Sequence, residues 1–548
     1  MASHELSFWG WGYAHRFASL GERGKLGLQL RLALGISSQT PRRPARLKSV
    51  ELAEPRIAVP EPFRGFCSGG REDRIRHTYG RAYPDLVRGF QGDFSPAPDL
   101  VAYPRREEDI SELLDWASGA RVAVIPYGGG TSVVGGVEGE VGDGFDGVLS
   151  LDLRGLDRVL EVDPVSRAAR IQAGATGPGL EAQLAEHGLT LRHYPQSYEF
   201  STLGGWIATR SGGHYATLKT HIDDFVESTR MLTPAGVLES RRLPASGAGP
   251  SPDRLVMGSE GILGVITEAW MRLQERPRFR SRAQLRFSDW KQAVQAARAI
   301  AQAGLHPANC RLLDRREARL HRVVDDDSHV LILAFESAQV PVREALEQAM
   351  SLAQAAGGRS AEKPVHREEG GEDARTDADG RWRRAFFDAP YLQTNLVSLG
   401  VIADTFETAC TWDRFEDLHE TVVAAVRDAS RRVCGRAAFV SCRFTHVYPD
   451  GPAPYYTFIA PGRRGAEIEQ WQQIKGAASA ALLDQGATIT HHHAVGRVHR
   501  PWYAEQSPKL FRDALAATKG RLDPAGILNP GVLLPATGPS EPGQSLDG

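Results

Sequence analysis

Apolar residues between about residues 100 and 275 follow helical and strand patterns in turn. Apolar residues at i, i+3, i+4 and i+7 predict one buried face of a helix, and they are Ile110, Leu113, Leu114 and Ala117. The continuous apolar run 122–125 is typical of a buried strand, and Pro126 and three glycines end it. Further runs predict strands at 148–153 and 169–173 and a short helix around Leu180 and Leu184, after the Gly177-Pro178-Gly179 break. Together these elements indicate a compact α+β unit.

The pattern changes at about residue 277. A helix over 343–356, with Leu346, Ala349, Met350 and Ala353 facing inward, follows an apolar strand over 330–335. Residues 361–380 are polar and charged, which predicts a mobile loop. The chain is therefore divided into an N-terminal extension (1–95), an α+β domain (96–276), a second domain (277–485), a C-terminal segment (486–534) and a disordered tail (535–548).

One leucine run in the N-terminal extension has a different period. Leucines occupy every second position from Leu26 to Leu34, which favours an edge strand over an amphipathic helix. Basic residues follow at Arg42, Arg43, Arg46 and Lys48. A solvated loop explains them, and a patch that rests on a lipid surface is the alternative.

Composition narrows the class of protein. Hydrophobic residues make up 41% and charged residues 24% of the 548 residues, and 65 basic against 67 acidic residues give a net charge of -2. This balance argues against a general nucleic-acid-binding protein. The five cysteines show no zinc-like spacing, and we find neither a secretory signal nor a long apolar window. These features predict a cytoplasmic protein with reduced thiols.

The strongest chemical signal is the loop after the strand at 122–125. It comprises Pro126, Tyr127, Gly128, Gly129, Gly130, Thr131 and Ser132. Consecutive glycines let a backbone approach a ligand closely, and the hydroxyls add donors, so the loop suits a diphosphate. Neither a Walker A nor a Rossmann motif is present, and such a loop by itself is more often only a turn.

Three further segments of small and hydroxyl residues favour a ligand-binding loop over a simple turn. They are Gln196, Ser197, Tyr198, Glu199, Phe200, Ser201 and Thr202, running into Leu203-Gly204-Gly205; then Thr209, Arg210, Ser211 and Gly212; then Glu260, Gly261, Ile262, Leu263, Gly264, Val265 and Ile266. Each borders an apolar element, as one extended ligand threaded between strands would require.

These segments resemble the FAD-binding domain of the vanillyl-alcohol oxidase (PCMH-type) superfamily. More narrowly, the chain resembles the alkyldihydroxyacetonephosphate synthase family over about residues 8–534. The narrower match lies in Trp9-Gly10-Trp11-Gly12-Tyr13, Ser201 to Trp206, Phe406-Glu407-Thr408-Ala409 with Trp412-Asp413, and His491 to Gly496. The resemblance implies a two-part FAD domain, an α/β cap domain and a helical N-terminal extension.

The resemblance also implies a reaction. Members of the family bind FAD without a covalent link and exchange the acyl chain of acyl-dihydroxyacetone phosphate for a long-chain alcohol, without net redox. Their small-molecule partners are therefore lipids. A homodimer and peripheral contact with a membrane are hypotheses that the sequence leaves open.

Five catalytic residues carry over from the family's motifs: Tyr455, Arg311, His491, His492 and His493. A tyrosine acts as a general base only where positive charge lowers its pKa, and strand packing is the alternative role for Tyr455. An arginine fork suits phosphate or carboxylate, and an ion pair with Asp314 is the alternative for Arg311.

The histidine run predicts a pocket rather than a metal centre. Three adjacent histidines cannot all face one metal, so no metal is expected, but two could point into a phosphate or flavin pocket. His193 matches another pocket histidine of the family, with a satisfied core histidine as the alternative.

One position departs from the family. Gln393 stands where the family has an arginine thought to hold the substrate. Loss of a charge-assisted bond weakens anion binding by about 1–3 kcal/mol, and Arg381, Arg383 and Arg384 are candidates to compensate. The departure keeps a second hypothesis open, an FAD-linked oxidase or dehydrogenase of a hydroxy acid or alcohol.

Overall fold

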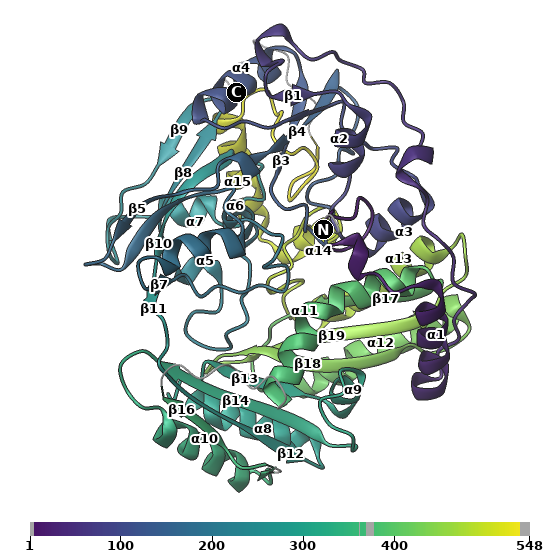
Figure 1. The fold of residues 1–548 in the computed structure, drawn as a ribbon, viewed down its shortest axis with the longest axis vertical. Helices are drawn as coiled ribbons and strands as arrows, with labels where there is room; N and C mark the ends of the chain where they lie inside the picture. Colours follow the sequence, from purple (N-terminus) through teal and green to yellow (C-terminus); the bar gives the residue numbers. More distant parts are fainter. Residues whose placement is uncertain (1–4, 361, 369–377, 537–548) are drawn as a thin grey trace.

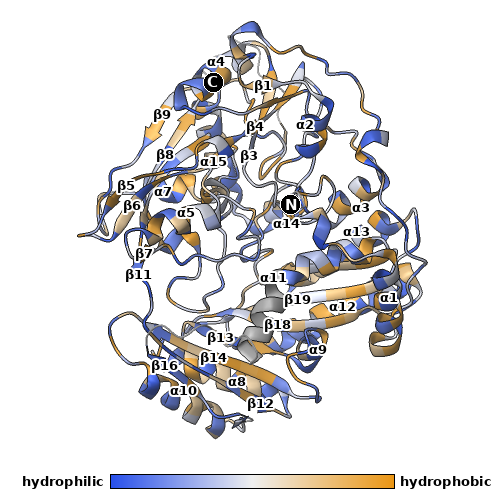
Figure 2. Cartoon of the chain, in the orientation of Figure 1, coloured by the Kyte–Doolittle hydropathy of each residue, from blue (hydrophilic) through white to orange (hydrophobic). Residues whose placement is uncertain are grey.

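Three main sheets organise the chain. The computed structural model describes residues 5–360, 362–368 and 378–536, without the side chains of 378–387. Two smaller sheets occupy the upper part of the view in Figure 1, and an eight-stranded sheet occupies the lower part. The fold is α+β, and apolar residues are concentrated in the strands (Figure 2).

The first sheet has the order β1-β2-β4-β3, with β2, β4 and β3 parallel. Its elements are β1 (Cys67–Ser68), β2 (Leu100–Ala102), β3 (Val122–Tyr127) and β4 (Gly147–Asp152), and α4 (Glu107–Gly119) packs on it. The predicted face of α4 is confirmed, because Ile110, Leu113, Leu114 and Ala117 are all buried in its core. The strands predicted at 122–125 and 148–153 are likewise confirmed.

The second sheet is antiparallel, with the order β5-β6-β10-β8-β9. Its strands are β5 (Val159–Asp163), β6 (Ala168–Gln172), β8 (Val226–Thr233), β9 (Gly236–Glu239) and β10 (Val265–Arg272). Helices α5 (Gly177–Ala185), α6 (Leu203–Thr209) and α7 (Pro252–Val256) lie beside it, and β7 (Leu189–Thr190) pairs with β11 (Gln274–Glu275). Helix α5 begins within the predicted Gly-Pro-Gly break, because Thr176 caps it and Pro178 fits its first turn.

The large sheet has the order β15-β12-β14-β13-β18-β19-β17, and β16 also pairs with β12. The strands are β12 (Phe279–Phe287), β13 (Asn309–Leu313), β14 (His329–Ser337), β15 (Arg359–Ser360), β16 (Val365–Glu368), β17 (Val401–Glu407), β18 (Phe439–Val447) and β19 (Pro452–Pro461). The helices between and after them are α8 (Trp290–Gln302), α9 (Arg315–Leu320), α10 (Arg343–Ala355), α11 (Ala378–Val397), α12 (Phe415–Cys434) and α13 (Glu467–Asp484). The predicted inward face of α10 is confirmed.

Alternation in β19 gives the large sheet two different faces. Tyr456, Phe458 and Ala460 enter an apolar core with α12 and α13. Tyr455, Thr457 and Ile459 point the other way and line a cavity. One face therefore holds the sheet to its helices, and the other is available for chemistry.

The segment expected to be a mobile loop, 361–380, contains regular structure. Strand β16 pairs with β12, which supplies the backbone partners that composition does not reveal, and α11 begins at Ala378. Residues 361 and 369–377 lie outside the described residues, as does most of the predicted tail, and the domain boundaries stay predictions.

The strand predicted at Leu26–Leu34 is wrong. These residues belong to helix α1 (Leu20–Leu34), which Ser19 and Glu22 begin with a capping box and which a left-handed Gly35 ends. Leu26, Leu30 and Leu34 lie one turn apart and pack against the large sheet, whereas Leu28 and Leu32 face outward. Both helix faces carry leucine, which produces the apparent period of two.

The N-terminal and C-terminal segments connect the two smaller sheets to the large sheet. The N-terminal segment runs along the right edge of Figure 1 from α1 to α2 (Arg71–Arg76), and α3 (Tyr83–Gln91) packs against α11 and α13. Helices α14 (Arg500–Gln506) and α15 (Lys509–Leu522) return to the upper part. In the described residues no helix is long and apolar enough to span a membrane.

Candidate active site

A cavity of about 310 Å³ lies between the loops of the upper domain and the open face of the large sheet. Two loops that are far apart in the sequence pack together to form one wall. A Cβ atom added to Gly129 would lie 1.9 Å from the Phe200 carbonyl oxygen, and one added to Gly128 would lie 2.2 Å from Thr202 Oγ1. Gly130 has a positive φ of 62°. Only glycines permit this close cradle, which fits the predicted role in holding a diphosphate.

Most of the predicted cofactor residues line this cavity. They are Pro126, Tyr127, Gly128, Gly129, Gly130, Thr131, Ser132, Gln196, Ser197, Ser201, Thr202, Thr209, Ser211, Gly212, Glu260, Gly261, Gly264 and Ile266. They come from all four predicted segments, so tertiary structure brings these together at one site, as a single extended ligand requires.

Seven predicted cofactor residues lie outside the cavity lining. Ile262, Leu263 and Val265 are buried in the apolar cores instead. Arg210 forms an ion pair with Asp223, and Glu199 lies 3.5 Å from Arg16. The rings of Tyr198 and Phe200 pack against Tyr194 and Tyr13. A contiguous motif places alternate side chains in different directions, so only part of it can face a ligand.

Glu260 connects the fourth predicted segment, 260–266, to the C-terminal segment. Its carboxylate accepts hydrogen bonds from the backbone N–H groups of Val495 at 2.9 Å and Gly496 at 2.8 Å. Burial raises the pKa of Glu260 to about 7, although these two bonds lower it. Residues that follow the histidine run are thereby fixed beside the glycine-rich loop.

The histidine run forms a tight turn around the carboxylate of Glu407. Glu407 accepts the backbone N–H groups of His491 at 2.6 Å, His492 at 3.0 Å and His493 at 2.8 Å. It also accepts the Thr490 hydroxyl at 2.6 Å. Burial alone would raise the pKa of Glu407, but the histidines and Thr490 hold it well below its usual value. Glu407 therefore fixes the backbone of the run.

The turn sends its three side chains in different directions. His492 and His493 line the cavity, as two of the three were expected to do, whereas His491 lies outside the lining. The Nε2 atom of His491 lies 2.8 Å from the Tyr448 hydroxyl. Burial lowers the pKa of His492 to about 3 and that of His493 to about 4, so both imidazoles are neutral at physiological pH.

Tyr455 faces the cavity from β19, opposite Glu407 in the β17–β19 register. Its hydroxyl donates to Thr405 Oγ1 at 2.9 Å, and the Arg443 guanidinium carbon lies 3.7 Å from its ring centroid. Burial raises the pKa of Tyr455, while Arg443 opposes that rise. The positive charge that a basic tyrosine needs is present, yet the hydroxyl keeps its proton at neutral pH.

Arg311 and Arg443 place two guanidinium groups on the same wall. Arg311 donates to the His214 carbonyl at 3.1 Å. The alternative partner Asp314 instead accepts the backbone N–H groups of Glu317 and Cys442. Arg443 forms a buried ion pair with Glu317 behind the cavity. Both arginines line the cavity, so this part of it is cationic.

Gln393 lies in the cavity wall, but its side-chain amide is hydrogen-bonded to other protein groups. Its amide donates to the Ala403 carbonyl at 3.0 Å and accepts from Trp11 Nε1 at 3.3 Å. A buried lysine, Lys475, lines the same wall and donates to the Thr405 carbonyl at 2.7 Å. The candidates Arg381, Arg383 and Arg384 lie outside the described side chains.

His193 does not line the cavity, but it contacts a residue that does. It is buried between Trp206 and Phe225, and its Nε2 lies 3.3 Å from the hydroxyl of Ser211, which does line the cavity. Burial lowers the pKa of His193 to about 3. Its placement favours the core alternative, with an indirect effect through Ser211.

Sequence reasoning did not assign roles to Glu407, Arg443, His446 or Lys475. Glu407 lies within the quoted Phe406-Glu407-Thr408-Ala409 motif, and a buried acid in such a motif was the available signal. The others come from β18 and α13, where the strand and helix patterns show only that a polar residue interrupts a buried face.

Comparison with known proteins agrees with this architecture. Residues 98–240 match the family model "FAD binding domain", and residues 276–533 match "FAD linked oxidases, C-terminal domain". Alkyldihydroxyacetonephosphate synthase of Trypanosoma brucei brucei is 31% identical over 485 residues, covering 85% of this chain and 78% of the relative. The protein of the same name from Dictyostelium discoideum is 31% identical over 481 residues, covering 84% and 77%.

Solved structures show the same fold. One described as an alkyldihydroxyacetonephosphate synthase superposes with a TM-score of 0.78 at 24% identity, covering 96% of this chain and 98% of that one. The two-part FAD-binding fold expected from the motifs is confirmed.

Proposed function

The chain belongs to the alkyldihydroxyacetonephosphate synthase family, and we propose that it is an FAD-dependent transferase that forms an ether lipid precursor. It exchanges the acyl chain of acyl-dihydroxyacetone phosphate for a long-chain alcohol. The observation that carries this proposal is one cavity that joins the glycine cradle to a cationic wall and an aliphatic end.

The two ends of the cavity suit the two ends of such a substrate. Arg311 supplies positive charge where a phosphate would bind. Arg443 and Lys475 line the same cavity, and each also pairs with an acid, Glu317 and Asp404 respectively. Leu320, Leu392, Leu396 and Ile459 supply an aliphatic surface where a hydrocarbon chain would lie. A small hydroxy acid would leave that aliphatic end unfilled, which favours the transferase over the oxidase hypothesis.

FAD would be held without a covalent link by the glycine loop, by residues 196–202 and 209–212, and by the loop that contains Glu260. When bound, it supplies transient covalent catalysis at the glycerone carbon without net electron transfer. Glu260 contributes by tying the backbone of Val495 and Gly496 to this loop.

The exchange requires one proton to move. The fatty acid leaves as a carboxylate, the alcohol provides the ether oxygen, and the alcohol proton must be accepted. His493 is a neutral imidazole in the cavity, with its ring centroid 5.3 Å from that of Tyr455, and we assign it the role of acceptor. The protonated Tyr455 hydroxyl, which donates to Thr405 Oγ1 in this structure, becomes a donor to the departing carboxylate when it turns away from Thr405.

An exchange assay tests this function. The FAD-loaded protein receives acyl-dihydroxyacetone phosphate and a labelled long-chain alcohol without oxygen or another electron acceptor. We expect labelled ether and one equivalent of free fatty acid. Absence of ether, together with bleaching of the flavin by a hydroxy acid or alcohol, would instead establish the oxidase hypothesis.

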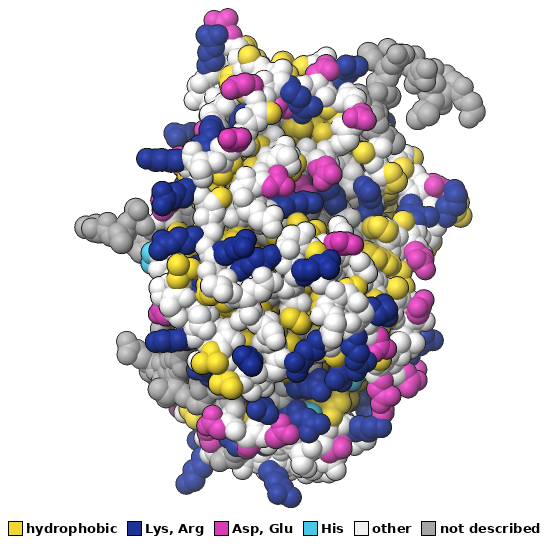
Figure 3. Space-filling model, turned by 90° about the vertical axis from the view of Figure 1, so that its right-hand side faces the viewer, with side chains coloured by type: hydrophobic (Ala, Val, Ile, Leu, Met, Phe, Trp, Pro, Cys, Tyr) yellow, Lys and Arg dark blue, Asp and Glu magenta, His cyan; other side chains and the backbone are white. Residues whose placement is uncertain are grey.

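Peripheral membrane contact is a second part of the proposal. Leu28 and Leu32 of α1 are 57% and 77% exposed, and α1 covers the aliphatic end of the cavity through Leu30. Figure 3 shows the face that carries α1, where Lys and Arg side chains are interspersed with apolar ones and with some Asp and Glu. Such a face suits an anionic lipid surface.

A homodimer and a cytoplasmic location stay predictions, and light scattering tests the homodimer.

A further inference from the structure

A group of imidazoles surrounds one corner of the cavity. A Cβ atom added to Gly212 would lie 3.0 Å from Cβ and Cγ of His492 and 3.3 Å from Cε1 of His446, so the backbone passes between these two side chains. Arg311 donates to the His214 carbonyl, and His446 Nε2 lies 3.1 Å from the adjacent Gly213 carbonyl. We call His446, His492, Gly212 and Arg311 the imidazole corner.

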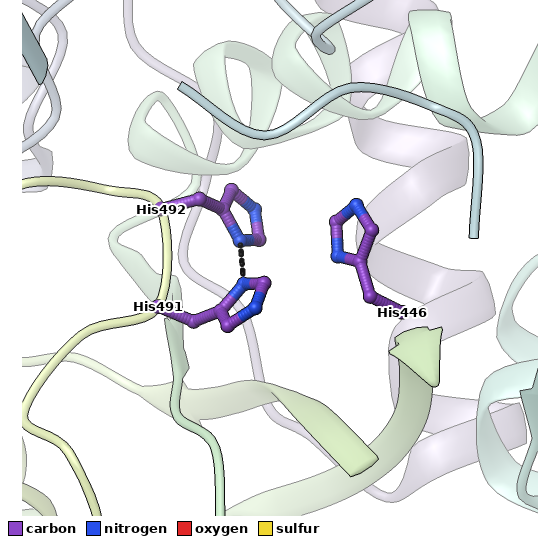
Figure 4. A group of neighbouring side chains, drawn as sticks. All are labelled: His446, His491 and His492. Atoms are coloured by element: carbon purple, nitrogen blue, oxygen red, sulfur yellow. Dashed lines mark hydrogen bonds between the residues drawn. The ribbon is translucent and has the colours of Figure 1, made fainter. Parts of the chain in front are cut away.

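Three of the nearby histidines also resemble a metal site. Nitrogen atoms of His446, His491 and His492 lie within 4.8 Å of one another, and Figure 4 shows the three rings around a common space. However, His491 uses Nδ1 toward His492 at 3.0 Å and Nε2 toward the Tyr448 hydroxyl at 2.8 Å. Both of its nitrogens are therefore engaged, and a metal would have to displace one of these partners.

Charge also distinguishes an anion from a metal cation in this corner. The guanidinium of Arg311 is close enough to contribute to lowering the pKa of His446. A fixed positive charge repels a divalent cation and attracts an anion at the same distance. The carboxylate of Glu407 on β17, around which the histidine turn folds, accepts hydrogen bonds from three backbone N–H groups.

We propose that the imidazole corner is the subsite for the phosphate of the substrate, with His446 and His492 as ligands beside Arg311. This inference rests on the proposed function, because the substrate supplies the phosphate. It assigns to His446 a specificity role that replaces part of the charge missing at Gln393, whose amide is committed to Trp11 and Ala403.

Proton uptake should accompany binding. The Nε2–H of His446 donates to the Gly213 carbonyl, and its Nδ1 lies 3.2 Å from Thr445 Oγ1. Nδ1 can therefore donate to a phosphate oxygen only after it gains a proton and turns from Thr445 to the ligand. Charged and titratable groups that face His446 are His221, His491, His492 and Arg311, and all of them, after burial itself, favour its neutral form. A phosphate dianion reverses that preference, so affinity should rise as pH falls, by about tenfold per pH unit for each proton gained.

Calorimetric titration of the FAD-loaded protein tests the subsite. Inorganic phosphate and dihydroxyacetone phosphate are the probes, and His446→Asn is the variant, because its amide keeps a polar group of similar reach without a charge. We expect His446→Asn to weaken both probes by about tenfold or more, as loss of one charge-assisted bond predicts. The matched control is His329→Asn, a buried histidine of β14 outside the cavity lining.

Several outcomes would overturn the subsite. Equal phosphate affinity in His446→Asn and the unsubstituted protein would do so. Stoichiometric Zn²⁺ binding that is lost in His446→Asn, without phosphate binding, would replace it with a metal site. A crystal structure of the FAD-loaded protein with dihydroxyacetone phosphate decides the matter even if the variant does not fold. Phosphorus between His446 and His492 supports the subsite, and any other position rejects it.

The subsite and the proposed function can fail separately. Phosphate bound in the corner without any acyl-for-alkyl exchange would retain the subsite and reject the transferase. Exchange with phosphate bound elsewhere would retain the transferase and reject the subsite.

Discussion

Glu407 and His492 are joined by a carboxylate-to-backbone contact that shapes the catalytic wall. The backbone N–H of His492 lies 3.0 Å and 3.2 Å from the two carboxylate oxygens of Glu407, and its ring Nδ1 lies 3.5 Å from one of them. The same carboxylate accepts the N–H groups on either side. A single buried acid thus positions the two histidines that face the cavity.

Glu407→Gln should disrupt this turn. The amide retains one acceptor oxygen and turns an NH2 group toward backbone donors, so about 1.5–3 kcal/mol is lost for each charged hydrogen bond removed. We expect the exchange rate to fall by about a hundredfold because the histidines shift. FAD content should persist, since Glu260 secures the next residues.

The matched control for this change is Glu181→Gln. Glu181 is also buried and accepts the Thr190 hydroxyl and the Arg192 backbone N–H, but it lies outside the cavity lining. Rates are measured with labelled alcohol. An unchanged rate in Glu407→Gln would show that the histidine turn does not depend on this carboxylate.

Tyr455→Phe should separate chemistry from packing. The change removes only the hydroxyl that donates to Thr405. We expect kcat to fall by about 10²–10⁴-fold, the range for loss of a proton-transfer or donor group. Tyr456→Phe is the control, because Tyr456 lies on the opposite face of β19, where its hydroxyl is 3.3 Å from His419 Nδ1. Equal rate losses in both variants would point to packing rather than catalysis.

Gly129→Ala should abolish FAD binding. Its Cβ would lie 1.9 Å from the Phe200 carbonyl oxygen, and two backbone segments would have to move apart. The ratio of flavin to protein absorbance measures the result. Gly24→Ala in α1 is the control, because its Cβ would meet nothing within 4 Å. Full flavin occupancy in Gly129→Ala would remove the cradle from the proposed binding site.

Acid should destabilise the protein before most carboxylates titrate. Burial lowers the pKa of His193 and His492 to about 3 and of His493 and His499 to about 4, from the ordinary histidine value of about 6.5. Between pH 6.5 and 4 the unfolded chain therefore binds more protons at these histidines than the folded chain. The free energy of unfolding then falls as pH falls, by roughly 1.4 kcal/mol per pH unit for each histidine.

At least three buried carboxyls act in the opposite direction. Burial raises the pKa of Glu260 and Asp314 to about 7 and that of Asp85 well above its usual value, so acidification favours their folded form. The histidines outnumber them, and we expect a lower Tm at about pH 5 than at about pH 7.5. A Tm that rises on acidification would mean that the histidine cluster is already charged in the folded protein.

Leu28→Glu with Leu32→Glu should weaken membrane contact. Both side chains are on the outer face of α1, and charge there opposes insertion into an anionic lipid surface. Flotation with anionic liposomes measures the bound fraction. Leu510→Glu on α15 is the control, because Leu510 is 82% exposed on another helix. Equal flotation of the double variant and the control would argue against α1 as the contact.

Local patterns in the sequence determined several elements of this protein. The spacing of Ile110, Leu113 and Leu114 predicted α4, and the apolar run 122–125 with its glycines predicted β3 and the cradle. These predictions succeed because helical periodicity and the backbone freedom of glycine are properties of a few neighbouring residues. The leucines of α1 misled for the same reason, since leucine on both faces imitates a strand, although the Ser19 and Glu22 capping signal was present.

Only the tertiary structure decided how the catalytic wall is assembled. Glu407 meets a turn 84 residues later in the chain, and His446 meets Gly213, 233 residues earlier. Arg443 reaches the Tyr455 ring because β18 and β19 pair in a register that places these two residues opposite each other. The sequence supplied the side chains, but their distances depend on strand pairing and on buried charges finding partners, and neither is encoded within a local window of residues.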